Sequence, residues 1–136
     1  MDWALDSSAA LAWVLPDERS SLAVRFFSNL KQGAILWIPT LWGYEIANAL
    51  SVAERRKRLT ETQSAQALAL LTELPLRTDN APDANSLWRY RCLALDHGLA
   101  AYDAAYLELA ERRGLGLATI DEKLSAAAKR AGVKTL

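Results

Sequence analysis

Four acidic residues stand at positions that suggest chemistry rather than solvation: Asp6, Glu45, Asp103 and Asp121, here called the acidic quartet. Asp6 and Asp121 each directly follow a short apolar segment. Asp103 lies near the start of a helical pattern beside apolar residues, and Glu45 is the only charged residue in the segment 41–53. Because a lone carboxylate near apolar surface is costly, such positions need a polar partner or a metal ion.

Carboxylates brought close together repel one another, and some would have to take up protons. A divalent cation among them removes this repulsion. Since all the candidate ligands are oxygens and no Cys or His lies nearby in the sequence, the set favours Mg²⁺ or Mn²⁺ over zinc. Such sites typically hydrolyse phosphodiesters: the metal polarises a phosphoryl oxygen, lowers the pKa of bound water and stabilises the leaving oxygen. The acidic quartet therefore predicts metal-dependent phosphodiester hydrolysis.

The elements that must bring these residues together can be predicted from the apolar pattern. Strands are predicted at residues 3–5, 35–38, 76–78, 117–120 and 133–136. Helices are predicted at about residues 9–14, 20–31, 41–56, 60–74, 80–96, 99–113 and 122–131. This alternation predicts one α/β domain over residues 1–136, with a parallel sheet of about five strands between helices on both faces. Ligands collect at the carboxyl ends of such strands, where Asp6 and Asp121 would lie.

Two helices have faces that the spacing predicts. In the helix from residue 99, the spacing i, i+3, i+4, i+7 predicts a buried face at Tyr102, Ala105, Tyr106 and Leu109. In the helix 41–56, the predicted stripe is Leu41, Glu45, Asn48, Ala49 and Val52. Glu45 lies at the centre of that stripe. Farther along, Thr60 and Gln63 predict a capping box for the next helix.

Composition sets limits on the class of protein. The 136 residues suit one domain with a core, and no apolar run approaches the roughly 18 residues of a membrane span. Lys plus Arg and Asp plus Glu number 16 each, so the net charge is zero and no overall field favours nucleic acid. The first residues lack the features of a signal peptide, and the single Cys92 fits a reducing compartment. We therefore expect a cytoplasmic protein with no membrane segment.

Four short motifs share their order and spacing with a known family. They are LDSSAAL at Leu5–Leu11, YEIANAL at Tyr44–Leu50, YDAAYLELA at Tyr102–Ala110 and ATIDEKL at Ala118–Leu124. Over nearly its whole length the sequence resembles the PIN-domain ribonucleases and, within them, the VapC-type toxins of toxin–antitoxin pairs. The resemblance implies a three-layer PIN-like fold, RNA as the substrate of endonucleolytic cleavage, a homodimer, and a small antitoxin as partner.

The resemblance also implies roles for residues. It assigns the acidic quartet as the catalytic site, with one or two Mg²⁺ or Mn²⁺ ions. Asp6, Asp103 and Asp121 would hold the metal directly or through water, and Glu45 would act through a metal-bound water. Thr119 matches a Thr or Ser that orients the site, as a residue hydrogen-bonded to a carboxylate or to the phosphate. Asn48 matches an Asn often found after the glutamate.

The sequence departs from the family pattern at one place. Some members have a further acid just after the fourth one. Here the nearby residues are Glu122, which is acidic, and Lys123, which adds a positive charge. The number of metal ions is therefore left open by the sequence.

Structural interpretations compete with these assignments. Asp6 and Asp121 would each suit the N-cap of a helix, and Asp103 would suit a helix N-terminus through the helix dipole. The basic run 55–58 is either a solvated helix end or an RNA contact. Trp42, less than one turn before Glu45, would stack on a base if it were exposed.

Other functions fit part of the pattern. An aspartyl-phosphate phosphatase needs a second Asp two residues after the first, where this chain has Ser8. A receiver domain needs an acidic pair at the first strand and a phospho-accepting Asp after a middle strand, and neither is evident. A non-catalytic PIN-like protein-binding module would not need all four acids. The acidic quartet together with the resemblance to the PIN-domain ribonucleases therefore favours a metal-dependent ribonuclease.

Overall fold

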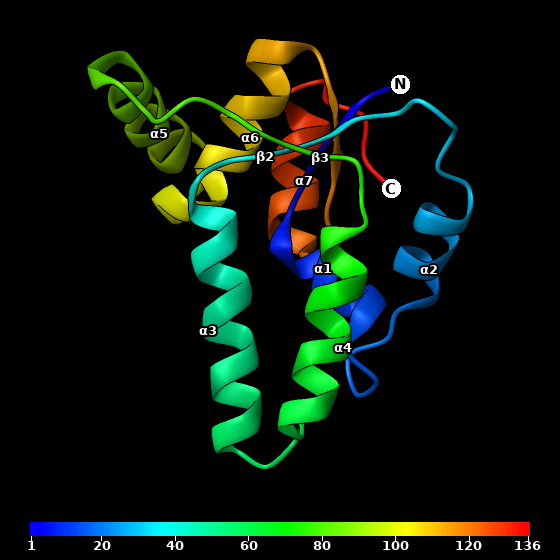
Figure 1. The fold of residues 1–136 in the computed structure, drawn as a ribbon. Helices are drawn as coiled ribbons and strands as arrows, with labels where there is room; N and C mark the ends of the chain where they lie inside the picture. Colours follow the sequence, from blue (N-terminus) through cyan, green and yellow to red (C-terminus); the bar gives the residue numbers. More distant parts are fainter.

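Figure 1 shows the computed structural model, which describes residues 1–136. Its strands are β1 (Trp3–Leu5), β2 (Leu36–Ile38), β3 (Leu76–Thr78) and β4 (Gly116–Ala118). Its helices are α1 (Ser7–Val14), α2 (Ser21–Ser28), α3 (Leu41–Arg55), α4 (Glu61–Thr72), α5 (Ala84–His97), α6 (Ala101–Arg113) and α7 (Glu122–Arg130). None of these helices combines the length and the hydropathy that a membrane crossing requires.

The four strands form one parallel sheet in the order β3-β2-β1-β4. Trp3 of the central strand β1 pairs with Leu36 on one side and with Gly116 on the other. Short, nearly all-apolar strands suit a sheet that is covered on both faces. Because all four strands point the same way, the residues that follow them meet at one edge, here called the carboxyl edge.

The predicted fifth strand at residues 133–136 is wrong. Only an isolated parallel bridge joins Leu117 to Thr135. Gly132, at a φ of 75°, ends α7, and the Val133 N–H turns back to the carbonyl of Ala128. Residues 133–136 therefore contribute one bridge to the sheet instead of a fifth ladder.

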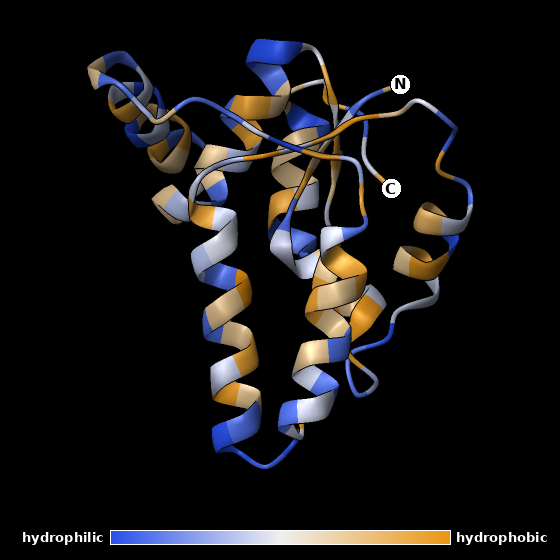
Figure 2. Ribbon diagram, viewed as in Figure 1, coloured by the Kyte–Doolittle hydropathy of each residue, from blue (hydrophilic) through white to orange (hydrophobic).

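The helices pack around the sheet as the three-layer prediction requires. α6 packs against β1 and β4, with α5 and α7 beside it, while α1 contacts α2, α3 and α4. α3 and α4 run side by side as a hairpin that projects away from the sheet (Figure 1). Figure 2 shows apolar residues along the strands and a hydrophilic tip on this hairpin. The predicted three-layer α/β fold is confirmed, with four strands instead of about five.

The predicted capping box at the start of α4 is confirmed. The Gln63 N–H donates to Thr60 Oγ1 at 3.1 Å, and the Thr60 N–H donates to Gln63 Oε1 at 2.9 Å. The box satisfies two backbone donors that the first turn of a helix leaves without partners. It thereby fixes where the second arm of the hairpin begins.

The predicted helix faces need correction at two points. The buried row of α3 is Trp42, Ile46, Leu50 and Ala53 rather than the stripe that contains Glu45. α1 and α4 pack on α3, and the Glu45 stripe lies at the border between buried and exposed surface, with Glu45 half-buried and Asn48 exposed. On α6 the predicted face is buried except for Tyr102, which is 69% exposed because it lies in the first turn of the helix, by the carboxyl edge.

Candidate functional site

Asp6 directly follows β1 and is almost fully buried, with 4% of its surface exposed. Its backbone occupies the N-cap position of α1, but its side chain caps nothing, so the N-cap interpretation is wrong for this residue. Instead, Asp6 Oδ2 accepts hydrogen bonds from Ser8 Oγ at 2.5 Å and from Thr119 Oγ1 at 2.7 Å. Burial raises the pKa of Asp6 in spite of these donors, and the charge of Asp121 raises it further.

Two hydroxyl groups join the end of β4 to the start of α1. Thr119 Oγ1 donates to Asp6 and accepts from the Asp121 N–H at 3.0 Å. Ser8 Oγ donates to Asp6 and accepts from the Ile120 N–H at 3.3 Å. Each hydroxyl therefore uses its hydrogen on the same carboxylate oxygen and its lone pair on the backbone that follows β4. Ser8 was missed by the sequence analysis, although its place two residues after Asp6 was the available signal.

Glu45, half-buried on α3, meets a residue that the sequence analysis assigned to the core alone. The hydroxyl of Tyr106 on α6 donates a hydrogen bond to Glu45 Oε1. Burial raises the pKa of Tyr106 well above its ordinary value, so the phenol stays protonated and acts as a donor. Burial, followed by the charges of Asp6 and Asp103, also raises the pKa of Glu45, against the opposing hydrogen bond of Tyr106.

The two remaining acids differ in their surroundings. Asp103, in the first turn of α6, is half-buried, and its pKa is raised by burial and by the charges of Asp6 and Asp121, with Lys123 opposing. Asp121 is exposed and caps α7, because its Oδ1 accepts the Leu124 N–H at 2.9 Å. The N-cap interpretation therefore holds for Asp121, and it leaves one carboxylate oxygen uncommitted.

The structure brings the acidic quartet together at the carboxyl edge. The charge of Asp6 raises the pKa values of Asp103 and Glu45, and the charge of Asp103 also raises the pKa of Glu45. The charge of Asp121 raises the pKa values of Asp6 and Asp103. Three of the four acids thus have pKa values raised by burial and by their acidic neighbours. Such a set holds excess negative charge, which protons or a cation would neutralise.

The residues present fit a hard divalent cation that is held partly through water. The donors are all carboxylate oxygens, and Asp103 has no hydrogen-bond donor of its own. No three acids are grouped tightly enough to enclose one ion as they stand. Mg²⁺, however, usually keeps several waters and is held through only one or two carboxylates. The open spacing therefore suits an ion that is bound partly through water.

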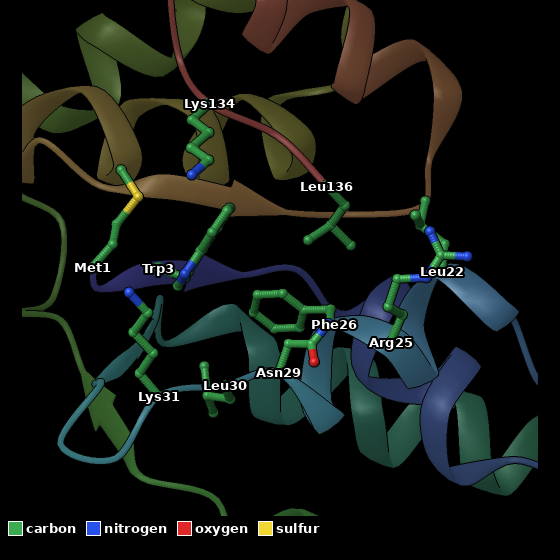
Figure 3. Close-up of a pocket in the computed structure, with 10 residues that line it drawn as sticks. All are labelled: Met1, Trp3, Leu22, Arg25, Phe26, Asn29, Leu30, Lys31, Lys134 and Leu136. Atoms are coloured by element: carbon green, nitrogen blue, oxygen red, sulfur yellow. The ribbon is translucent and has the colours of Figure 1, made fainter.

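The basic run, Trp42 and a hollow by β1 all lie apart from the acidic quartet or are closed to a ligand. The basic run 55–58 is at the tip of the hairpin, away from the sheet (Figure 1), where Arg58 pairs with Asp17 at 2.8 Å. Trp42 is only 6% exposed, which excludes it as a stacking surface. A cavity of about 370 Å³ lies by the start of β1, lined by Trp3 and Phe26 among others (Figure 3). No member of the acidic quartet lines that cavity.

Comparisons with known proteins agree with the fold and the sequence motifs. The family model described as "PIN domain" matches residues 4–130. Ribonuclease VapC3 of Pyrobaculum aerophilum is 37% identical over 125 residues, which is 92% of this chain and 93% of that protein.

Solved structures extend the likeness to the whole fold. PAE2754 of Pyrobaculum aerophilum has a TM-score of 0.71 at 29% identity, covering 99% of this chain and 83% of that one. VapBC-1 of nontypeable Haemophilus influenzae has a TM-score of 0.66 at 17% identity, covering 100% and 97%, and so supports the fold alone. By family model, sequence identity and fold, this chain belongs to the PIN domain family and is of the VapC type.

Proposed function

We propose that this protein is an endoribonuclease that depends on Mg²⁺ or Mn²⁺ and acts in the cytoplasm as the toxin of a toxin–antitoxin pair. The observation that supports this most directly is the convergence of four carboxylates, three with raised pKa values, at the carboxyl edge of a parallel sheet. Proteins rarely gather such charge without a cation or proton to offset it.

The roles follow from what each side chain contacts. Asp6, Asp103 and Asp121 would hold the ion directly or through water, and Glu45 would position a water near it. Bound there, a divalent ion supplies charge that stabilises the phosphoryl oxygen and the leaving oxygen. Thr119 fixes the orientation of Asp6 through its hydrogen bond. Because Thr119 and Ser8 both bind Asp6 Oδ2, Oδ1 is the oxygen left for the ion.

The relatives suggest the substrate and the partners. VapC20 of Mycobacterium tuberculosis, which shares the fold with a TM-score of 0.64, is a toxin that cleaves the sarcin–ricin loop. VapBC2 of Rickettsia felis was crystallised with a DNA fragment from its promoter. For this chain, we propose RNA as the substrate, a small antitoxin as the inhibitor, and a homodimer as the working form.

The test is cleavage of total RNA by the purified protein, freed of any partner, with Mg²⁺, with Mn²⁺, and with a chelator. We expect discrete cuts that need the ion and that map to a small number of sites. Asp6→Asn should abolish them, whereas Asp96→Asn, on the exposed surface of α5, should not. If the wild-type protein leaves RNA intact with both ions, the chain is a binding module rather than a nuclease. Cleavage by Asp6→Asn at the wild-type rate would refute the assignment of the site.

A further inference from the structure

Tyr106 is a phenol placed where a hydrocarbon would suffice. The residue belongs to α6, and its side chain is fully buried, with none of its surface exposed. Phenylalanine would fill the same space without bringing a polar group into the core. Since burying a hydroxyl costs free energy unless it is hydrogen-bonded, its partner is the feature to explain. That partner is Glu45 Oε1, on a different helix.

The carboxylates of Glu45 and Asp6 share one feature, which is a hydrogen bond from a hydroxyl group to one oxygen. At Asp6, hydroxyl groups occupy one carboxylate oxygen and leave the other without a protein donor. At Glu45, Tyr106 likewise occupies Oε1. Tyr106 also lies three residues after Asp103, so both side chains project from adjoining turns of α6. One helix therefore supplies an acid of the quartet and the group that orients a second acid.

We propose that Tyr106 is a positioning residue, whose hydroxyl holds the Glu45 carboxylate in one orientation toward the rest of the acidic quartet. The inference rests on the proposed function for its catalytic consequence, but the hydrogen bond would act on metal binding whatever the substrate. Without this donor, the half-buried Glu45 carboxylate would keep only the Ser7 side chain as a hydrogen-bond partner and would be less restrained. Partners that orient metal-binding carboxylates typically contribute 10- to 100-fold in metal affinity or activity.

The test compares Tyr106→Phe, which removes one oxygen atom and keeps the ring, with the wild-type protein. Tyr90→Phe is the matched control, because it removes a phenol from the half-buried surface of α5, outside the quartet. The measurements are the Mn²⁺ dissociation constant by calorimetry, kcat and KM for the RNA that the wild type cuts, and the melting temperature. For Tyr106→Phe we expect weaker Mn²⁺ binding or a lower kcat by about tenfold or more, with KM within about twofold of wild type. Tyr90→Phe should match the wild type in Mn²⁺ binding and in kcat.

A second comparison separates positioning from simple support of the core. In a Glu45→Ala background, Tyr106→Phe should change neither Mn²⁺ binding nor kcat further, since the group it orients is gone. A purely structural effect would persist in that background and would overturn the proposal. So would wild-type values of both Mn²⁺ affinity and kcat in Tyr106→Phe. If the wild type binds Mn²⁺ but cuts no RNA, the proposed function fails, while weaker Mn²⁺ binding by Tyr106→Phe would still support this inference.

Discussion

Thr119 donates its hydroxyl hydrogen to Asp6 Oδ2 at 2.7 Å, across 113 residues of sequence. The two residues follow neighbouring strands, β4 and β1, that run in parallel. Parallel pairing therefore brings a donor from one end of the chain onto an acid from the other. The same hydroxyl accepts the Asp121 N–H, so one side chain fixes the relation between two acids of the quartet.

Removing that hydroxyl should impair the site more than the fold. In Thr119→Val the volume and the strand preference are retained, but Asp6 loses a donor and Asp121 loses an acceptor for its backbone N–H. We expect a 10- to 100-fold loss of metal-dependent cleavage and a destabilisation of about 1–2 kcal/mol, measured by RNA cleavage and by chemical unfolding. Thr78→Val, on the exposed end of β3, is the control and should retain activity. Wild-type cleavage by Thr119→Val would show that the hydroxyl has no role in orienting Asp6.

Asp6→Asn should separate activity from stability. The Asp6 side chain is almost fully buried, and its charge contributes to the raised pKa values of Glu45 and Asp103. The substitution removes that charge. We therefore expect no cleavage, together with unfolding in a chelator at the same or a higher denaturant concentration than wild type. Circular dichroism during denaturation measures the second effect. A marked loss of stability would mean that the Asp6 charge supports the fold rather than opposing it.

The acidic quartet should also make the metal-free protein less stable as the pH rises. Burial and neighbouring charges raise the pKa values of Asp6, Glu45 and Asp103 above their ordinary values of 3.8, 4.5 and 3.8. The folded state then binds more protons than the unfolded state, so its stability is greatest below these ordinary values and falls as the pH rises through the folded values. Chemical unfolding in a chelator, repeated over about four pH units from pH 4 to pH 8, measures how the free energy of unfolding depends on pH. Asp6→Asn should reduce that dependence.

Near neutral pH, a bound divalent ion should restore the stability that the metal-free protein loses as the pH rises. Mn²⁺ at about 100 times its dissociation constant should stabilise the wild-type protein by about 2.7 kcal/mol. Asp6→Asn, stripped of bound ions before Mn²⁺ is added, should show a much smaller gain at the same Mn²⁺ concentration. Equal stabilisation of both proteins would place the ion away from the acidic quartet.

The sequence predicted the strand ends well because parallel strands leave little freedom there. Asp6 and Thr119 follow apolar runs, and strand pairing alone then brings them together at the carboxyl edge. Helix faces were harder to predict. The apolar stripe through Glu45 and the true buried row beginning at Trp42 differ by one position. The buried row carries no charged or amide side chain, and this was the available signal for choosing it.

The hydrogen bond from Tyr106 to Glu45 could not be predicted from spacing. Tyr106 fits an apolar pattern on α6, and nothing local indicates whether its hydroxyl finds a partner. The contact depends on the angle between two helices that are far apart in the sequence. The missing fifth strand has a similar origin, since the turn at Gly132 decides how the residues after it lie against β4.

Close approach of two strands should make Gly116 intolerant of a side chain. A Cβ at this position would lie 2.5 Å from the ring of Trp3, on the neighbouring strand β1. Gly116→Ala should therefore destabilise the protein by about 1–3 kcal/mol through displacement of the indole, measured by thermal or chemical unfolding. Gly43→Ala is a useful contrast, because that Cβ meets nothing within 4 Å and the residue lies in α3. There the substitution should stabilise the protein by about 0.5–1 kcal/mol. Equal effects at the two positions would contradict this account of the strand contact.

An ion-pair network at the end of α6 should support the fold without contributing to chemistry. Asp79, 8% exposed after β3, accepts hydrogen bonds from Arg112 and from Arg113, the latter at 3.0 Å. Burial would raise the pKa of Asp79, but the two guanidinium groups outweigh it and hold that pKa below its usual range. Because both arginines are partly exposed, we expect Asp79→Asn to cost about 1–3 kcal/mol, less than the loss of a fully buried pair. The cleavage rate at a temperature where the variant is folded should stay within about twofold of wild type, since Asp79 orients no member of the acidic quartet. A large loss of cleavage with unchanged stability would instead make this network part of the catalytic site.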